Sequence, residues 1–240
     1  MSIPVIDFGP CFAGAPGALD ATASTLRETL ETIGFFVMVN HGVPEPLIDQ
    51  TFVEARRFHA QPMDWKLALR MNEHNNGYMT MGRYAVWTSE VNKNDKPDLN
   101  EAFFCRRELP DDHPMRRSGR RFVGPNLWPS DLAGFREQVL AYTDAMDALS
   151  GRVLRVCAVA LELPPDAFDA AFAESQFTMR LTHYPPLTAA PNQFGIAPHT
   201  DANFLTFLAQ SDVPGLQVRA WTTDALPGKR ATTGGPTRRK

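Results

Sequence analysis

Cysteine is scarce in this chain. Its three cysteines, Cys11, Cys105 and Cys157, are scattered over 240 residues, and no two of them form a CxxC pair. An odd, dispersed set argues against a disulfide framework and against a zinc site built from cysteines. We expect these thiols to be small buried side chains, since no adjacent base is evident, and we expect the protein to be cytoplasmic.

An excess of charge of one sign is also lacking. The chain has 24 Lys and Arg against 27 Asp and Glu, a net charge of −3, so no field attracts nucleic acid or an anionic membrane. No apolar run approaches the roughly 20 residues of a membrane helix, and residues 1–8 do not form a signal-peptide pattern. We therefore expect no nucleic-acid or membrane partner, while the oligomeric state stays open.

Helical periodicity dominates the first sixty residues. Apolar residues recur every three or four positions from Leu19 to Ile33, which predicts a helix that ends at Gly34. The apolar run 35–39 predicts a buried strand, and the pattern that opens at Pro44 predicts a second helix. Residues 72–128 are punctuated by glycine and proline, so we expect loops and short strands there.

The second half of the chain changes from a helical to a strand period. The apolar positions from Leu132 to about Leu163 predict one long helix, which ends at Pro164. Residues 177–184 alternate between an apolar face and a polar face that carries Thr178, Arg180, Thr182 and Tyr184. Further strands are expected at 196–199, 204–209 and 216–219, which gives an α+β fold.

The last 21 residues, 220–240, differ in composition. They hold five Thr, three Gly, two Pro and five Lys or Arg against one acid. Such a stretch buries too little apolar surface to offset the entropy of ordering it. We expect a disordered tail.

The motif His199-Thr200-Asp201 is the main candidate for chemistry. Residues two apart on a strand point the same way, so this motif would bring an imidazole and a carboxylate together. By itself the spacing is weak evidence, because a histidine hydrogen-bonded to a nearby acid is the commoner arrangement.

Several ordered blocks of sequence add to this motif. They are residues 3–7 (IPVID), 34–43 (GFFVMVNHGV), 77–78 (GY), 98–103 (DLNEAF), 179–186 (MRLTHYPP), 199–208 (HTDANFLTFL) and 214–218 (PGLQV). Together they resemble the isopenicillin N synthase-like branch of the iron(II)- and 2-oxoglutarate-dependent oxygenases.

This resemblance implies a fold and a chemistry. The fold would be a double-stranded β-helix (jelly-roll) core with N-terminal helices and a long supporting helix. His199 and Asp201 would be two iron(II) ligands, since two histidines and a carboxylate form the facial triad of such enzymes. Tyr184 and Thr182 would line the pocket for the cosubstrate 2-oxoglutarate. The expected reaction is oxidation of a small molecule by dioxygen, as hydroxylation, desaturation or cyclisation, or ethylene formation from 2-oxoglutarate.

The sequence also departs from the family pattern. Relatives carry a second histidine ligand and an Arg-x-Ser pair several dozen residues beyond the carboxylate, whereas His199 is the last histidine here and no Arg-x-Ser follows it. We therefore expect a chain truncated or frameshifted near residue 219, with the last core strands missing. The expected parts are an N-terminal oxygenase region (1–125), a partial jelly-roll core (126–219) and a non-family tail (220–240).

Three hypotheses follow from this departure. The chain is an oxygenase with weakened iron binding, a catalytically inactive remnant, or a protein that binds a small ligand in the old pocket. His183 is a conceivable replacement for the missing ligand. Strand alternation points it away from Tyr184, however, which favours a core or surface role.

Overall fold

The structure is a computed structural model that describes residues 2–83, 85–86, 96–219 and 230–232. It divides into two compact units whose segments interleave along the chain. The first unit contains residues 1–48, 144–175 and 207–240, and the second contains 49–143 and 176–206. Across the described ranges, no helix is both long and apolar enough to span a membrane.

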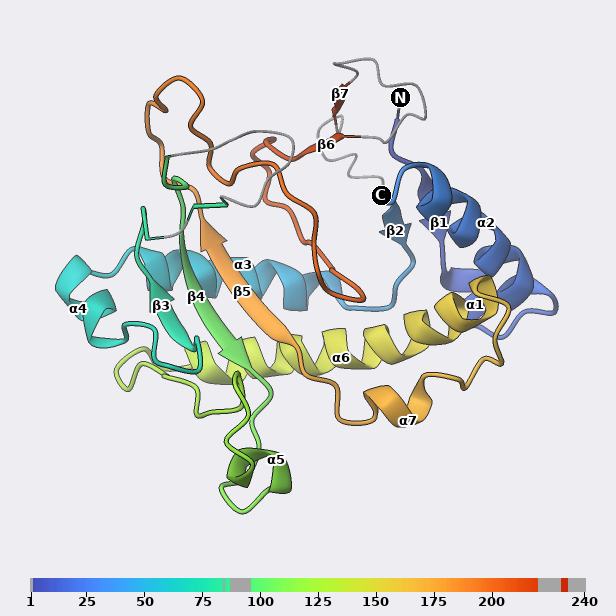
Figure 1. Cartoon of the computed structure of the whole chain (residues 1–240), viewed down its shortest axis with the longest axis horizontal. Coiled ribbons are helices and arrows are strands. Elements are labelled where there is room, and N and C mark those ends of the chain that lie inside the picture. The colour runs from blue at the N-terminus through green and yellow to red at the C-terminus, as the bar shows by residue number, and fades with distance from the viewer. Residues whose placement is uncertain (1, 84, 87–95, 220–229, 233–240) are drawn as a thin grey trace. The chain divides into compact units, whose positions relative to one another are not determined.

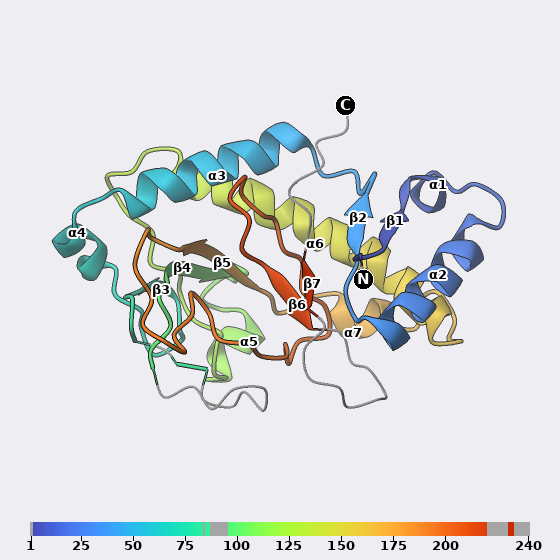
Figure 2. The same ribbon diagram turned by 90° about the horizontal axis from the view of Figure 1, so that it is seen from above.

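The first unit holds a short parallel strand pair with helices beside it. Strand β1 (Val5–Asp7) pairs with β2 (Val37–Val39), and helix α2 (Ala18–Thr32) lies beside β1 (Figure 2). The predicted end of α2 is confirmed: Gly34 has a φ of 77° and donates its N–H to the Thr29 carbonyl at 3.0 Å. The unit also contains α1 (Gly9–Phe12) and α7 (Asp169–Phe172), and β6 (Gln217–Arg219) paired antiparallel with β7 (Arg230–Thr232).

The second unit is built around an antiparallel sheet in the order β3-β4-β5 (Figure 1). Its strands are β3 (Gly77–Met79), β4 (Glu101–Arg106) and β5 (Thr178–His183), and the register places Glu101 opposite His183. Short helices α4 (Met63–Ala68) and α5 (Pro114–Arg117) belong to the same unit.

The two long helices contribute to both units. Helix α3 (Glu45–His59) has Glu45 in its first turn and Arg56 and Arg57 in its last, which suits the helix dipole. Helix α6 (Phe135–Ala160) is the predicted long helix, although it begins three residues after Leu132. Both helices lie in the segments where the sequence places apolar residues at helical intervals.

The core of the second unit is aromatic. Phe58, Phe103 and Phe135 are fully buried, and the Phe58 ring centroid lies 4.8 Å from that of Phe103 and 5.4 Å from that of Phe135. Leu181 on β5 joins this core, and Met179 packs against it, which confirms the predicted apolar face of that strand. The opposite face of β5 therefore carries Arg180 and Thr182.

Two expectations about the fold need correction. No strand covers 196–199 or 204–209; those residues are irregular, while the strand expected at 216–219 forms as β6. The run 35–39 does form a strand at β2, but it is not fully buried, because Phe35 is 47% and Val37 is 45% exposed. Of the expected disordered tail, only Arg230–Thr232 lies within the described residues, where it forms β7.

Candidate functional site

His199 and Asp201 lie together, as the sequence predicts. The His199 Nδ1 atom is 2.8 Å from the Ala197 carbonyl oxygen, and its Nε2 atom is 3.3 Å from Asp201 Oδ1. Since a carbonyl only accepts, Nδ1 carries the hydrogen, and Nε2 is the ring nitrogen on the side of the carboxylate. An imidazole nitrogen and a carboxylate oxygen this close together are two atoms of the kinds that bind iron(II).

The backbone that brings these two side chains together is not the predicted strand. A strand needs a partner for its N–H and C=O groups, and no strand pairs with residues 196–209 within the described parts of the chain. Instead, residues 193–197 are bonded to residues 97–100, at the end of the sheet where β4 begins and β5 ends (Figure 1). The bonds are Gln193 Nε2 to Pro97 O at 3.0 Å, Leu99 N to Phe194 O at 2.9 Å, Asn100 Nδ2 to Gly195 O at 2.6 Å and Ala197 N to Asp98 Oδ1 at 3.0 Å.

Tyr184 belongs to the same region. Tyr184 is the first residue after β5. Its ring packs against Gly195, which lies four residues before His199 in the sequence. Partial burial raises the pKa of the Tyr184 hydroxyl, although Arg180 lowers it, so the hydroxyl stays protonated near neutral pH and can donate a hydrogen bond. Thr182 lies opposite Ala102 in the sheet register. Among the described residues, no hydrogen bond joins Thr182 to His199 or Asp201.

A second cluster of metal-ligand type was not predicted. His59, Glu101 and His183 each offer one ligand atom, and these atoms lie within 4.8 Å of one another. Glu101 Oε1 is 2.8 Å from His183 Nδ1 and 3.4 Å from His59 Nδ1. His183 is therefore hydrogen-bonded to Glu101, across the sheet from it. The three residues come from α3, β4 and β5.

The Glu101 carboxylate in this cluster already has its donors. Lys66 Nζ lies 2.9 Å from Oε2, and the Tyr78 hydroxyl donates to the same oxygen. Burial by itself raises the pKa of Glu101, but the hydrogen bonds from Tyr78, His183 and Lys66 lower it to about 2. A divalent cation here would be buried beside the Lys66 ammonium with one carboxylate to balance both. We therefore interpret the cluster as a structural hydrogen-bond network.

The local sequence contains one signal for this network. Glu101 opens a strand whose next four residues are apolar, and a charged residue in a buried strand needs partners. Its partners are 23 to 82 residues away along the chain, so the signal indicates that a network exists but not which residues form it.

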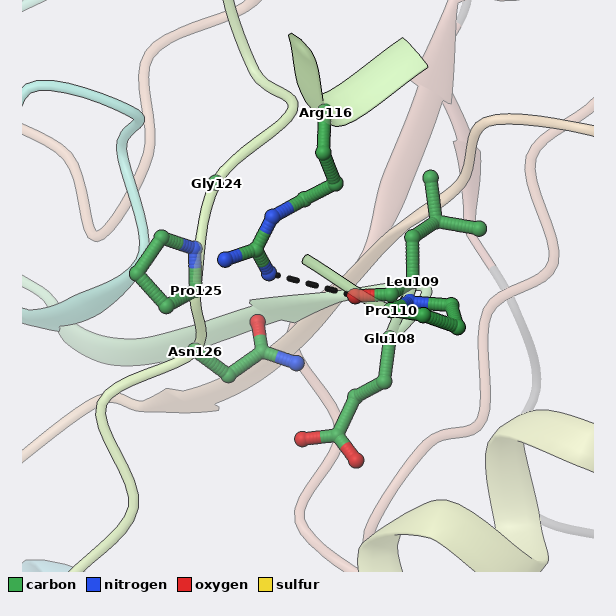
Figure 3. A pocket seen from close by; sticks show the side chains of 7 residues that line it. All are labelled: Glu108, Leu109, Pro110, Arg116, Gly124, Pro125 and Asn126. Atoms are coloured by element: carbon green, nitrogen blue, oxygen red, sulfur yellow. Dashed lines mark hydrogen bonds between the residues drawn. The ribbon is translucent and has the colours of Figure 1, made fainter. Parts of the chain in front are cut away.

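A pocket of about 400 Å³ lies elsewhere in the second unit (Figure 3). In that view Arg116 points towards the segment of Leu109, whose carbonyl it binds at 3.2 Å, and its other nitrogen binds Asp111 at 2.6 Å. Glu108 accepts a hydrogen bond from Trp128 at 2.6 Å and pairs with Arg136. Both charged groups at this pocket have partners, and none of the predicted site residues lines it.

Family models match two parts of the chain. Residues 3–131 match the model described as the N-terminal region of the non-haem dioxygenase in morphine synthesis, and residues 175–233 match the 2OG-Fe(II) oxygenase superfamily. The first match alone covers more than half of the 240 residues. This chain belongs to the 2-oxoglutarate- and iron(II)-dependent oxygenases. Iron(II) and 2-oxoglutarate are the cofactor and cosubstrate of that family.

Individual oxygenases of this family are similar over most of the chain. The 2-oxoglutarate-Fe(II) type oxidoreductase hxnY of Emericella nidulans is 34% identical over 90% of this chain and 62% of its own length. The 2-oxoglutarate-dependent dioxygenase citB of Monascus ruber is 33% identical over 90% of this chain and 67% of its own length. The chain thus spans about two thirds of the length of these relatives.

Solved structures of oxygenases share the fold. The crystal structure of JOX2 in complex with 2OG, Fe and JA matches with a TM-score of 0.70 at 28% identity, over 97% of this chain and 61% of that chain. A 2OG-Fe(II) oxygenase family protein from Caulobacter crescentus matches with a TM-score of 0.65 at 26% identity, over 77% and 57% of the two chains. The mixed helix and antiparallel-sheet architecture is therefore that of the jelly-roll oxygenases.

Proposed function

We propose that this chain is an oxygenase that uses iron(II), 2-oxoglutarate and dioxygen to oxidise a small molecule. His199 and Asp201 hold the metal, and Tyr184 and Thr182 belong to the 2-oxoglutarate pocket. The observation that carries the proposal is the 3.3 Å approach of His199 Nε2 to Asp201 Oδ1, with Nδ1 bonded to the Ala197 carbonyl so that Nε2 is the nitrogen beside the carboxylate. The three cysteines form no disulfide in the structure, which supports a cytoplasmic location.

Each of these side chains has a definite task. His199 Nε2 and the Asp201 carboxylate would supply a nitrogen and an oxygen ligand to the metal. When bound, the iron centre supplies the activation of dioxygen that amino-acid side chains cannot provide. The Tyr184 hydroxyl, kept protonated by its raised pKa, donates a hydrogen bond to a 2-oxoglutarate carboxylate.

Binding of Co(II) tests the metal site. His199→Ala and Asp201→Ala are expected to weaken Co(II) binding roughly tenfold or more, because each removes one ligand. His183→Gln, a change in the other histidine cluster, is the matched control and should leave the dissociation constant unchanged. The measurement is a calorimetric or visible-absorption titration of the whole chain. Loss of Co(II) binding in His183→Gln, with none in His199→Ala, would place the metal in the Glu101 cluster instead.

Release of succinate tests the activity itself. The proposal predicts that succinate appears only when iron(II) and 2-oxoglutarate are both supplied, and that His199→Ala abolishes it. Metal-independent binding of 2-oxoglutarate without succinate would favour a ligand-binding protein. Absence of both binding and turnover would favour an inactive remnant.

Gly195 provides a test of the cosubstrate pocket. A Cβ at this position would lie 2.8 Å from Tyr184 Cδ1, so Gly195→Ala must displace the ring. We expect the dissociation constant for 2-oxoglutarate to rise several-fold while the Co(II) affinity is kept. Gly151→Ala is the control, because a Cβ there meets nothing within 4 Å. Unchanged 2-oxoglutarate binding in Gly195→Ala would remove Tyr184 from the pocket.

A further inference from the structure

Asp98 is a buried carboxylate that is hydrogen-bonded to the backbone two residues before His199, a proposed metal ligand. It is 1% exposed, three residues before β4, and its Oδ1 atom accepts the Ala197 N–H at 3.0 Å. Burial raises the pKa of Asp98, whereas the hydrogen bond from the Ala197 N–H is the largest effect that lowers it. The buried Asp98 carboxylate is therefore held against the backbone of the segment that leads to His199.

Ala197 connects the two side chains. This residue is fully buried, and both of its backbone groups are used: its N–H is bound by Asp98, and its carbonyl oxygen accepts the His199 Nδ1 hydrogen at 2.8 Å. A buried backbone residue held on both sides has little freedom to rotate. The position of the Ala197 carbonyl decides which ring nitrogen of His199 carries the hydrogen.

Neighbouring contacts strengthen this arrangement. Asn100 Nδ2 binds the Gly195 carbonyl at 2.6 Å, and Arg180 Nη2 binds Asn100 Oδ1 at 2.6 Å. The segment before His199 is thus fixed by side chains from the start of β4, where a sheet ladder is lacking over the described residues. Within this group, Asp98 is separated from the His199 imidazole by a single residue, Ala197, to which both side chains are hydrogen-bonded.

We propose that Asp98 is a positioning residue that holds the Ala197 backbone so that Nε2 of His199 faces the metal. This inference rests on the proposed function, in which His199 is an iron ligand. Metal-bound histidines in general donate their other ring hydrogen to a carbonyl or carboxylate, and such outer contacts tune metal affinity. Here the outer carbonyl is itself held by a buried acid.

The tautomer of His199 tests the proposal without any metal. Histidine ¹⁵N NMR of the whole chain should show Nδ1–H for His199 in the wild type, and a mixture of both tautomers in Asp98→Ala. Asn126→Ala is the matched control, because Asn126 also bridges two backbone groups, the N–H and C=O of Arg106, at 2.9 and 2.8 Å. It should lower the melting temperature yet leave the His199 tautomer unchanged.

Co(II) affinity gives the second measurement. Asp98→Ala should weaken Co(II) binding about tenfold, the usual effect of losing an outer contact, and Asn126→Ala should not. Asp98→Asn keeps a neutral oxygen of the same reach, so part of the affinity should return, leaving Co(II) binding about threefold weaker than in the wild type. If Asp98→Ala fails to fold, Asp98→Asn is the deciding variant. A threefold loss of Co(II) affinity in Asp98→Asn supports the proposal, and wild-type affinity overturns it.

The outcomes separate the two proposals. Wild-type tautomer and affinity in the folded Asp98 variants, with loss of binding in His199→Ala, would refute the role of Asp98 and leave the oxygenase proposal intact. Absence of Co(II) binding in the wild type would refute the metal site. The NMR comparison would then still support or refute the link between Asp98 and His199.

Discussion

Replacing Glu101 by Ala is expected to lower the free energy of unfolding by about 3–5 kcal/mol, the usual cost of leaving a buried charge without its partner. The residue left behind is Lys66, which is 5% exposed and whose ammonium lies 2.9 Å from the carboxylate. Tyr78 and His183 lose an acceptor in the same change. This loss is a large fraction of the stability of an ordinary domain.

A double variant separates charge pairing from packing. Lys66→Met alone leaves a buried carboxylate and should destabilise by a similar amount. Glu101→Met combined with Lys66→Met removes both charges, so it should be more stable than either single variant. Urea titrations followed by tryptophan fluorescence give the free energies. A double variant whose loss equals the sum of the losses in Glu101→Met and Lys66→Met, each measured alone, would show that the pair is not energetically coupled.

Elements governed by local sequence were predicted well. Helix α2 and its end at Gly34 follow from apolar periodicity and from one residue that tolerates positive φ. The faces of β5 follow from alternation, since each successive side chain points to the opposite side. Exposure was less predictable: Phe35 and Val37 are apolar yet nearly half exposed, because burial depends on what packs against a strand.

The candidate site shows the limit of local reasoning. His199 and Asp201 do meet, but the reason given for it, a shared strand face, was wrong. The segment before them is held by side chains of residues 98–100, about 95 positions earlier, and no periodicity records such a contact. Family resemblance supplied the pair of residues; only the structure supplies Asp98 and Asn100 as the groups that hold them.

The Glu101 network was missed for a similar reason. His59 is the last residue of α3 and Lys66 lies on α4. Both would suit an exposed helix face, yet both are buried. Whether such side chains are exposed or paired depends on the carboxylate that the fold brings to them. The sequence does not reveal this pairing, because Lys66 and Glu101 are 35 residues apart along the chain.

His59 is expected to make the protein sensitive to mild acid. Its side chain is 4% exposed, and its Nε2 atom lies 3.0 Å from the Leu181 carbonyl oxygen. Burial lowers the pKa of His59 from 6.5 to about 4, against the smaller raising effects of that hydrogen bond and of Glu101. The folded chain therefore holds this imidazole neutral at pH values where the unfolded chain protonates it.

The sign of the effect follows from proton linkage. Between pH 6.5 and 4 the unfolded state binds more protons at His59, so stability falls as the pH falls, by up to about 3 kcal/mol over this window. Glu101 adds a separate loss at lower pH: its pKa is about 2 in the fold and 4.5 otherwise, so the stability it contributes is complete above pH 4.5 and disappears towards pH 2.

The variant His59→Gln isolates the first window. Its neutral amide can still donate to the Leu181 carbonyl but does not titrate, so unfolding free energies measured at intervals from pH 7.5 to 4 should vary less steeply than in the wild type. Above pH 7 the two proteins should show the same slope, which is the internal control. Equal slopes between pH 6.5 and 4 would mean that folding does not lower the pKa of His59.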